Sequence, residues 1–126
     1  MFQKTYDIKA VPASRPRVTR SHRVYYTKTY TKFRQDWQAI TKKDWPAMQA
    51  EMENTHEYAF SFEICFAKHP RADLDNLTKA LQDSLMKAEL NHIQVLLDDN
   101  FCTDLHGVKH SDTGLNQIKL RIWRIK

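Results

Sequence analysis

The stretch YAFSFEICFA, residues 58–67, decides the fold, because its side chains alternate between the two faces of a strand without a break. Aromatic and aliphatic side chains occupy every second position from Tyr58 to Phe66, and mostly small or polar side chains lie between them. Aromatic and β-branched residues are enriched in strands. The stretch therefore predicts a strand with one fully apolar face.

Other segments alternate less strictly and predict further strands of the same sheet. Residues 2–11 and 116–125 alternate apolar and polar side chains, and residues 101–110 are a third candidate. The sequence Asp112-Thr113-Gly114 is typical of a turn. The last two strands are close enough in sequence to form an antiparallel pair.

Two segments predict helices that pack on this sheet. From about Thr27 to Ile40, apolar side chains recur at the spacing of one helix face. Asp44, followed by Trp45 and Pro46, predicts the N-cap of a second short helical piece that runs to about residue 54, with a break between the pieces. A further helix is expected from Asp73 or Leu74 to about residue 88.

Together these elements predict an α+β fold in a single domain, residues 1–126, in the order β-α-β-α-β-β. One mixed sheet with two main helices packed on it is the simplest way to bury the apolar faces. Hydrophobic residues make up 41% of the chain, which suits a globular domain. We expect no membrane segment and no signal peptide, and therefore a cytoplasmic protein. Cys65 and Cys102 are expected to be buried, reduced thiols.

The chain is basic, with a formal net charge of +5, and much of this charge lies in one segment. Residues 14–28 contain no acidic side chain and interleave arginine with serine, threonine and tyrosine. Guanidinium groups and hydroxyls suit phosphate contacts, and tyrosine rings can stack on unpaired bases. We therefore expect a loop or extended arm, about residues 12–28, that binds DNA by its shape; a solvated loop with a chance charge bias is the alternative. The candidate DNA-binding residues are Arg15, Arg17, Arg20, Arg23, Lys28 and Arg71.

Acidic residues gather around the expected helix at residue 73. Asp73 lies at its start, whereas Asp75, Lys79 and Asp83 share one face, and Asp98-Asp99 follow on a turn. Mg²⁺ takes oxygen ligands, is held by a few carboxylates plus substrate phosphate, and suits phosphodiester hydrolysis. A nearby lysine can stabilise the developing charge. Without a metal, Asp73 would instead be an N-cap, and Asp75 and Lys79 an ion pair.

Several other classes fit these residues less well. A phosphatase of the Asp-x-Asp type has its carboxylates directly after a strand, and a restriction-type nuclease has Asp/Glu-x-Lys on a strand. Here the carboxylates and the lysine lie on the expected helix. A zinc site is not expected, because Cys65 and Cys102 lack a CxxC partner and His106 and His110 are too few. The non-enzymatic alternative is a junction- or single-strand-DNA-binding module with inert carboxylates.

Two parts of the sequence resemble the RusA family of Holliday junction resolvases, which is found largely in phages and prophages. The first part is PASRPRVTR at residues 12–20, followed by Tyr25, Tyr30, Arg34 and Trp37. The second is DLDNLTKALQDSL at residues 73–85, with Asp98-Asp99 downstream.

This resemblance implies a structure-selective endodeoxyribonuclease that resolves four-way junctions by paired nicks, in recombination and repair. It implies that Asp73, Asp75 and Asp99 are the essential acidic residues, with Asp98 adjacent, and that Lys79 is the required lysine. We expect Mg²⁺ as the cofactor, held by these aspartates, with Mn²⁺ able to substitute. The expected partners are branched DNA and a second copy of the chain in a homodimer, and no membrane.

Overall fold

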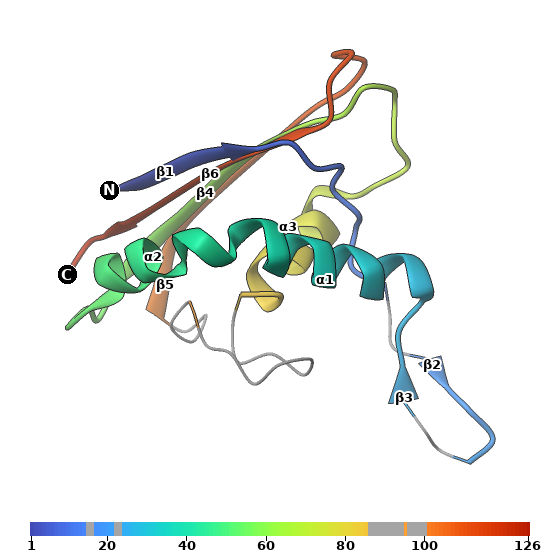
Figure 1. Cartoon of the computed structure of the whole chain (residues 1–126), viewed down its shortest axis with the longest axis horizontal. Helices are drawn as coiled ribbons and strands as arrows, with labels where there is room; N and C mark the ends of the chain where they lie inside the picture. Colours follow the sequence, from blue (N-terminus) through green and yellow to red (C-terminus); the bar gives the residue numbers. More distant parts are fainter. Residues whose placement is uncertain (15–16, 22–23, 86–94, 96–100) are drawn as a thin grey trace.

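A computed structural model describes residues 1–14, 17–21, 24–85, 95 and 101–126, with only the backbone of Arg17, Val24 and Tyr25. It forms one mixed four-stranded sheet, with helices on one face and a small two-stranded hairpin (Figure 1). The elements are β1 (Phe2–Tyr6), β2 (Arg17–Val18), β3 (Val24–Tyr25), α1 (Lys28–Thr41), a 3₁₀ turn η1 (Lys42–Asp44), α2 (Trp45–Met52), β4 (Tyr58–Cys65), α3 (Leu74–Asp83), β5 (Cys102–His110) and β6 (Gln117–Arg124). The predicted α+β fold is confirmed.

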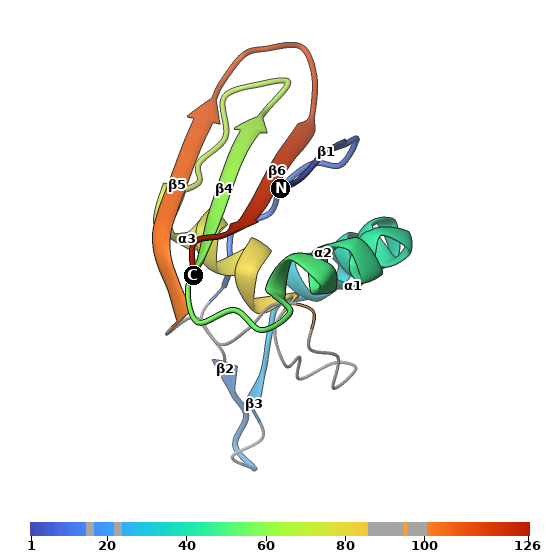
Figure 2. The same ribbon diagram turned by 90° about the vertical axis from the view of Figure 1, so that its left-hand side faces the viewer.

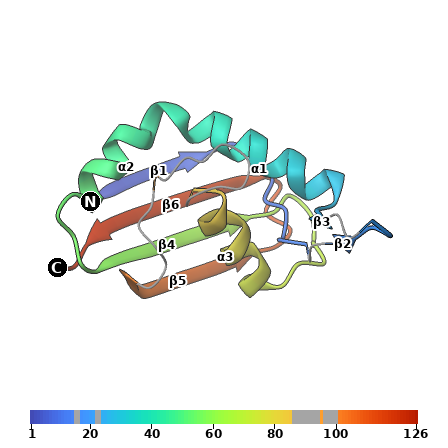
Figure 3. The same cartoon turned by 90° about the horizontal axis from the view of Figure 1, so that it is seen from below.

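The strand order is β1-β6-β4-β5, so the decisive strand β4 lies inside the sheet (Figure 3). β4 runs parallel to β5 and antiparallel to β6, and β1 runs antiparallel to β6. The predicted pairing of the last two strands with each other is wrong, because β4 lies between them. α3 connects β4 to a parallel neighbour, as such a crossover requires. The strand β6, which is more apolar than β5, pairs on the other side of β4.

The helices of the described residues lie on the same face of the sheet, as Figure 2 and Figure 3 show. That face carries the buried rows Phe60, Phe62 and Ile64 of β4 and Ile118, Leu120 and Ile122 of β6. The predicted apolar face of α1 is confirmed, since Tyr30, Phe33 and Trp37 are buried and Ile40 packs against them.

Two side chains of α1 bind the carboxyl-terminal end of α3. The indole of Trp37 donates to the carbonyl of Leu81 (3.3 Å), and the amide of Gln38 donates to the carbonyl of Ser84 (2.9 Å). Both bonds are buried, and a buried hydrogen bond costs free energy to break. They fix the position of α3 relative to α1.

The expected break between the two helical pieces is the turn η1. Asp44 occupies the N-cap position of α2, but its side chain does not cap the helix. The carboxylate instead accepts a hydrogen bond from the hydroxyl of Tyr6 (2.8 Å) and lies 3.1 Å from the ammonium of Lys4. Burial raises the pKa of Tyr6, and the bond to Asp44 raises it further. Asp44 therefore ties β1 to the helical layer.

The segment expected to be a loop or arm is a β-hairpin. β2 and β3 pair antiparallel, and the hairpin projects from the body beyond the start of α1 (Figures 1 and 2). At its base, the hydroxyl of Thr27 donates to that of Ser14 (3.4 Å).

Cys65 and Cys102 are free, as expected, but they are half-buried and not fully buried. Burial raises the pKa of the Cys102 thiol. None of the helices in the described ranges has the length and apolar composition that a membrane crossing requires.

Candidate active site

The helix α3 turns one side to the core and the other to an open groove. The helix begins after Asp73, whose carbonyl accepts a hydrogen bond from the amide of Leu77 (3.1 Å). Leu77 and Leu81 are fully buried against the sheet. Residues four apart share a helix face, so the opposite side carries a charged row. That row is Asp75, Lys79 and Asp83.

This charged row lines a groove of about 700 Å³ between α3 and the edge strand β5. The prediction that the three side chains share a face is thus confirmed. Among the residues that the structure describes, the lining is Leu74, Asp75, Thr78, Lys79, Gln82, Asp83, Leu105 and Gly107. Asp75 and Lys79 are exposed to solvent, where a substrate can reach them.

The side chains at the start of α3 make neither the capping bond nor the ion pair of the structural alternative. Asp73 occupies the N-cap position, but its side chain makes no capping hydrogen bond. One oxygen of Asp75 accepts from the amide of Asn76 (2.9 Å). Among the ion pairs of the described residues, none joins Asp75 to Lys79. The carboxylates of Asp73 and Asp75 are therefore not engaged in either of these two interactions.

The residues present suit a hard divalent cation by the chemistry of their donors. Asp73 and Asp75 offer carboxylate oxygens on an exposed surface, the ligand type that Mg²⁺ prefers. Within the described ranges, no three potential ligands come together. The other two predicted ligands, Asp98 and Asp99, lie outside the described residues.

The basic hairpin is attached beside this groove. The amide of Ala13 donates to the carbonyl of Asn76 (2.9 Å), in the first turn of α3. The segment that leads into the hairpin is therefore fixed next to Asp75. This bond joins the two predicted functional segments, which are far apart in the sequence.

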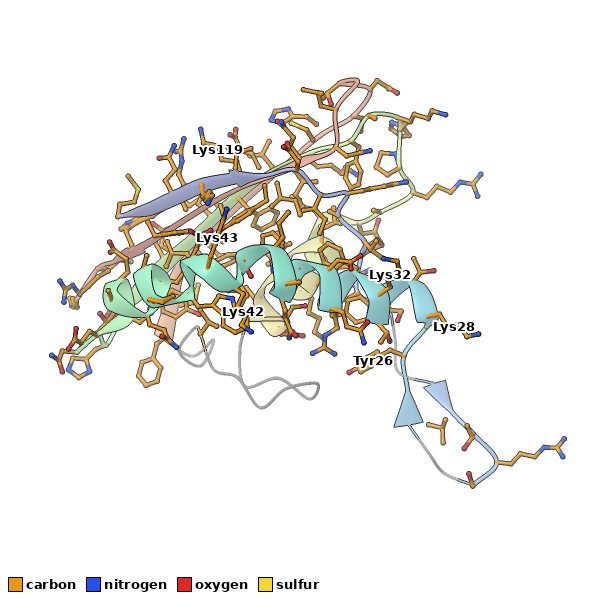
Figure 4. The ribbon with its side chains drawn as sticks, in the orientation of Figure 1. Tyr26, Lys28, Lys32, Lys42, Lys43 and Lys119 are labelled. Atoms are coloured by element: carbon orange, nitrogen blue, oxygen red, sulfur yellow. The ribbon has the colours of Figure 1, made fainter. Side chains whose placement is uncertain are left out.

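The predicted DNA-binding residues are distributed over the hairpin, the start of α1 and the segment before α3. Arg20 is exposed in the hairpin turn, Lys28 is exposed at the start of α1, and Arg71 is exposed shortly before α3. Arg17 lies in β2, whereas Arg15 and Arg23 are outside the described residues. Figure 4 shows Lys28 at the end of α1 nearest the hairpin.

One basic residue that follows the arm in the sequence does not lie on its surface. Arg34 is buried, with 3% of its surface exposed. Its guanidinium lies 5.5 Å from the ring centroids of both Tyr26 and Tyr30, a cation–π geometry. Tyr26 is the last residue before the Thr27 cap, so this contact fixes the hairpin exit on α1 (Figure 4). The spacing of four between Tyr26, Tyr30 and Arg34 was the available signal.

The other groove residues missed from the sequence are on β5. Leu105 and Gly107 lie opposite α3 only because β5 pairs with β4, which the local pattern could not reveal. A glycine inside a strand often marks a close approach, and that signal was present at Gly107. A Cβ there would overlap the ring of Phe62.

Carboxylates and a lysine in an open groove, with a basic hairpin attached beside it, suit the handling of a polyanionic substrate. The model of one family, Endodeoxyribonuclease RusA, matches residues 7–123. The chain belongs to the RusA endodeoxyribonuclease family, whose members are Holliday junction resolvases. Among curated proteins, none matches the chain.

We expect the Asp73→Ala substitution to leave stability almost unchanged. Its free energy of unfolding should fall by about 0.5 kcal/mol or less, the size of an exposed charge's interaction with the helix dipole. Thr27→Ala is the matched control, because the Thr27 hydroxyl accepts from the amide of Tyr30 (3.3 Å) and caps α1. Losing that cap should cost about 1 kcal/mol. Urea unfolding of both variants makes the comparison; an equal or larger loss for Asp73→Ala would make Asp73 a structural cap.

Proposed function

We propose that this chain is a Mg²⁺-dependent Holliday junction resolvase that cuts DNA in the groove between α3 and β5. The observation that carries the proposal is the placement of Asp75 and Lys79 in one open groove. The segment that leads into the basic hairpin is bonded to Asn76, the residue after Asp75. Family membership supplies the reaction class.

In this proposal Asp73 and Asp75 hold the metal ion together with Asp99, and Asp98 lies adjacent. When bound, Mg²⁺ would supply charge neutralisation and activation of water, with Mn²⁺ as a substitute. Lys79 shares the groove with Asp75 and is one helical turn away. Its ammonium is proposed to stabilise the negative charge that develops on the phosphate.

The hairpin is proposed to hold the DNA by its backbone. Arg20 and its neighbours Arg15, Arg17 and Arg23 would contact phosphates, with Lys28 and Arg71 nearer the groove. Phosphate contacts fix position without reading sequence, which suits recognition of a branched shape. Two symmetric nicks need two active sites, so we propose that the enzyme acts as a homodimer, in recombination and repair.

We predict that Asp75→Asn abolishes junction cleavage and keeps junction binding, because the amide has almost the same shape but a weaker affinity for the cation. Lys79→Ala should slow cleavage by about 10²-fold or more, as the loss of one charge-stabilising donor does elsewhere. The measurement is single-turnover cleavage of a four-way junction, with binding measured separately in chelator.

Asp112→Asn is the matched control, because Asp112 is exposed on the β5–β6 connection and has a positive φ that asparagine tolerates. It should cut at the normal rate. Full activity of Asp75→Asn would show that this groove is not the place where DNA is cut.

We predict that Arg20→Ala weakens junction binding and flattens its dependence on salt by about one unit of log–log slope, since one phosphate contact is lost. Lys42→Ala is the control; Figure 4 shows Lys42 toward the end of α1 away from the hairpin. Both variants are titrated with junction at several salt concentrations. An unchanged slope for Arg20→Ala would count against phosphate contacts by the hairpin.

A further inference from the structure

Two leucines are exposed in the same groove as the charged row. Leu74 is 38% exposed at the start of α3, and Leu105 is 50% exposed on β5. Leu105 pairs in register with Phe60, so it lies on the face of the sheet that the helices cover. Single exposed leucines are ordinary on protein surfaces. Two that line one groove beside Asp75 and Lys79 form an apolar surface next to a charged one.

The wall of this groove has no side chain at Gly107. The glycine pairs in register with Phe62, whose buried ring occupies the space where a side chain would begin. The β5 side of the groove therefore combines the side chain of Leu105 with the backbone of Gly107 packed on Phe62. The volume of about 700 Å³ lies within the usual range of ligand sites, roughly 300–1,000 Å³.

We propose that Leu74 and Leu105 form a subsite for one unstacked nucleotide of branched DNA. A nucleotide combines an anionic phosphate with the apolar faces of a base and a deoxyribose. The groove also has a charged and an apolar part. Lys79, which shares the groove with the carboxylates of Asp75 and Asp83, can take the phosphate, and the two leucines can take the sugar and base. This inference rests on the proposed function and adds the part of the substrate that the groove selects.

Such a subsite favours a junction over a duplex. Bases in a continuous duplex are stacked on both faces, so the leucines could contact them only after unstacking. Unstacking costs least where pairing is already interrupted, as at a branch point. The leucines would therefore raise affinity for the junction and leave duplex affinity unchanged, whereas the basic hairpin attracts both.

The test compares Leu74→Ala and Leu105→Thr with Val108→Thr as control. Val108 is 42% exposed on the same strand but faces the opposite side of the sheet. Binding is measured in chelator on a four-way junction and on a linear duplex of the same sequence. A 2-aminopurine at the branch point reports unstacking by increased fluorescence. Thermal unfolding shows that each variant folds.

We expect each leucine variant to bind the junction about fivefold more weakly, because apolar surface is no longer covered, and to bind the duplex unchanged. The fluorescence increase on junction binding should be lost in these variants and kept in Val108→Thr. Equal losses on junction and duplex, or no loss on either, would overturn the subsite.

Failure of the subsite and failure of the proposed function give different results. If the wild-type protein cuts junctions and the leucine variants match it in binding and fluorescence, the nuclease assignment stands and the subsite is wrong. If the wild-type protein shows the leucine-dependent fluorescence increase but does not cut the junction with any divalent ion, the subsite stands and the proposed reaction is wrong.

Discussion

The burial of one side of α3 is the constraint on which the site depends. Leu77 and Leu81 are fully buried against the sheet, and Trp37 and Gln38 hold the far end of the helix through its backbone carbonyls. Once that side of α3 is fixed against the core, helical spacing determines the direction of its other side chains. Asp75 and Lys79 must face away from the core, toward β5, in an open groove.

The same helix also links the acidic groove to the basic hairpin. The backbone of Asn76 accepts the hydrogen bond from Ala13, while Arg34 holds the other side of the hairpin base through Tyr26. Like charges within the hairpin repel one another, and the carboxylates repel DNA phosphate. A cation at the carboxylates, as proposed above, would remove the second repulsion.

The sequence predicted the parts of the fold that depend on local periodicity. The alternation in β4 and the helical spacing in α1 and α3 come from each segment's own residues, and the structure confirms them, although α3 ends at Asp83, before the predicted end at about residue 88. Strand order depends on which edges meet after the chain crosses over, and the antiparallel pair predicted for the last two strands was therefore wrong. The hairpin strands have two residues each, too few to show a period.

The site was predictable to the same extent. The row of Asp75 and Lys79 follows from spacing within one helix, whereas Leu105 and Gly107 reach the groove through tertiary pairing. The charge of Arg34 gave no sign of its position against Tyr26 and Tyr30, because that contact is a property of the packed structure. The positions of Asp98 and Asp99 relative to α3 stay a prediction.

The most direct test of the central claim is cleavage by the wild-type protein of a synthetic four-way junction and a linear duplex of the same sequence, each with Mg²⁺ and with chelator. The account predicts paired, symmetric nicks in the junction alone, and only with Mg²⁺. Equal cutting of the duplex, or cutting in chelator, would contradict it. Tight junction binding without cutting under any divalent ion would also contradict it and would indicate a binding module.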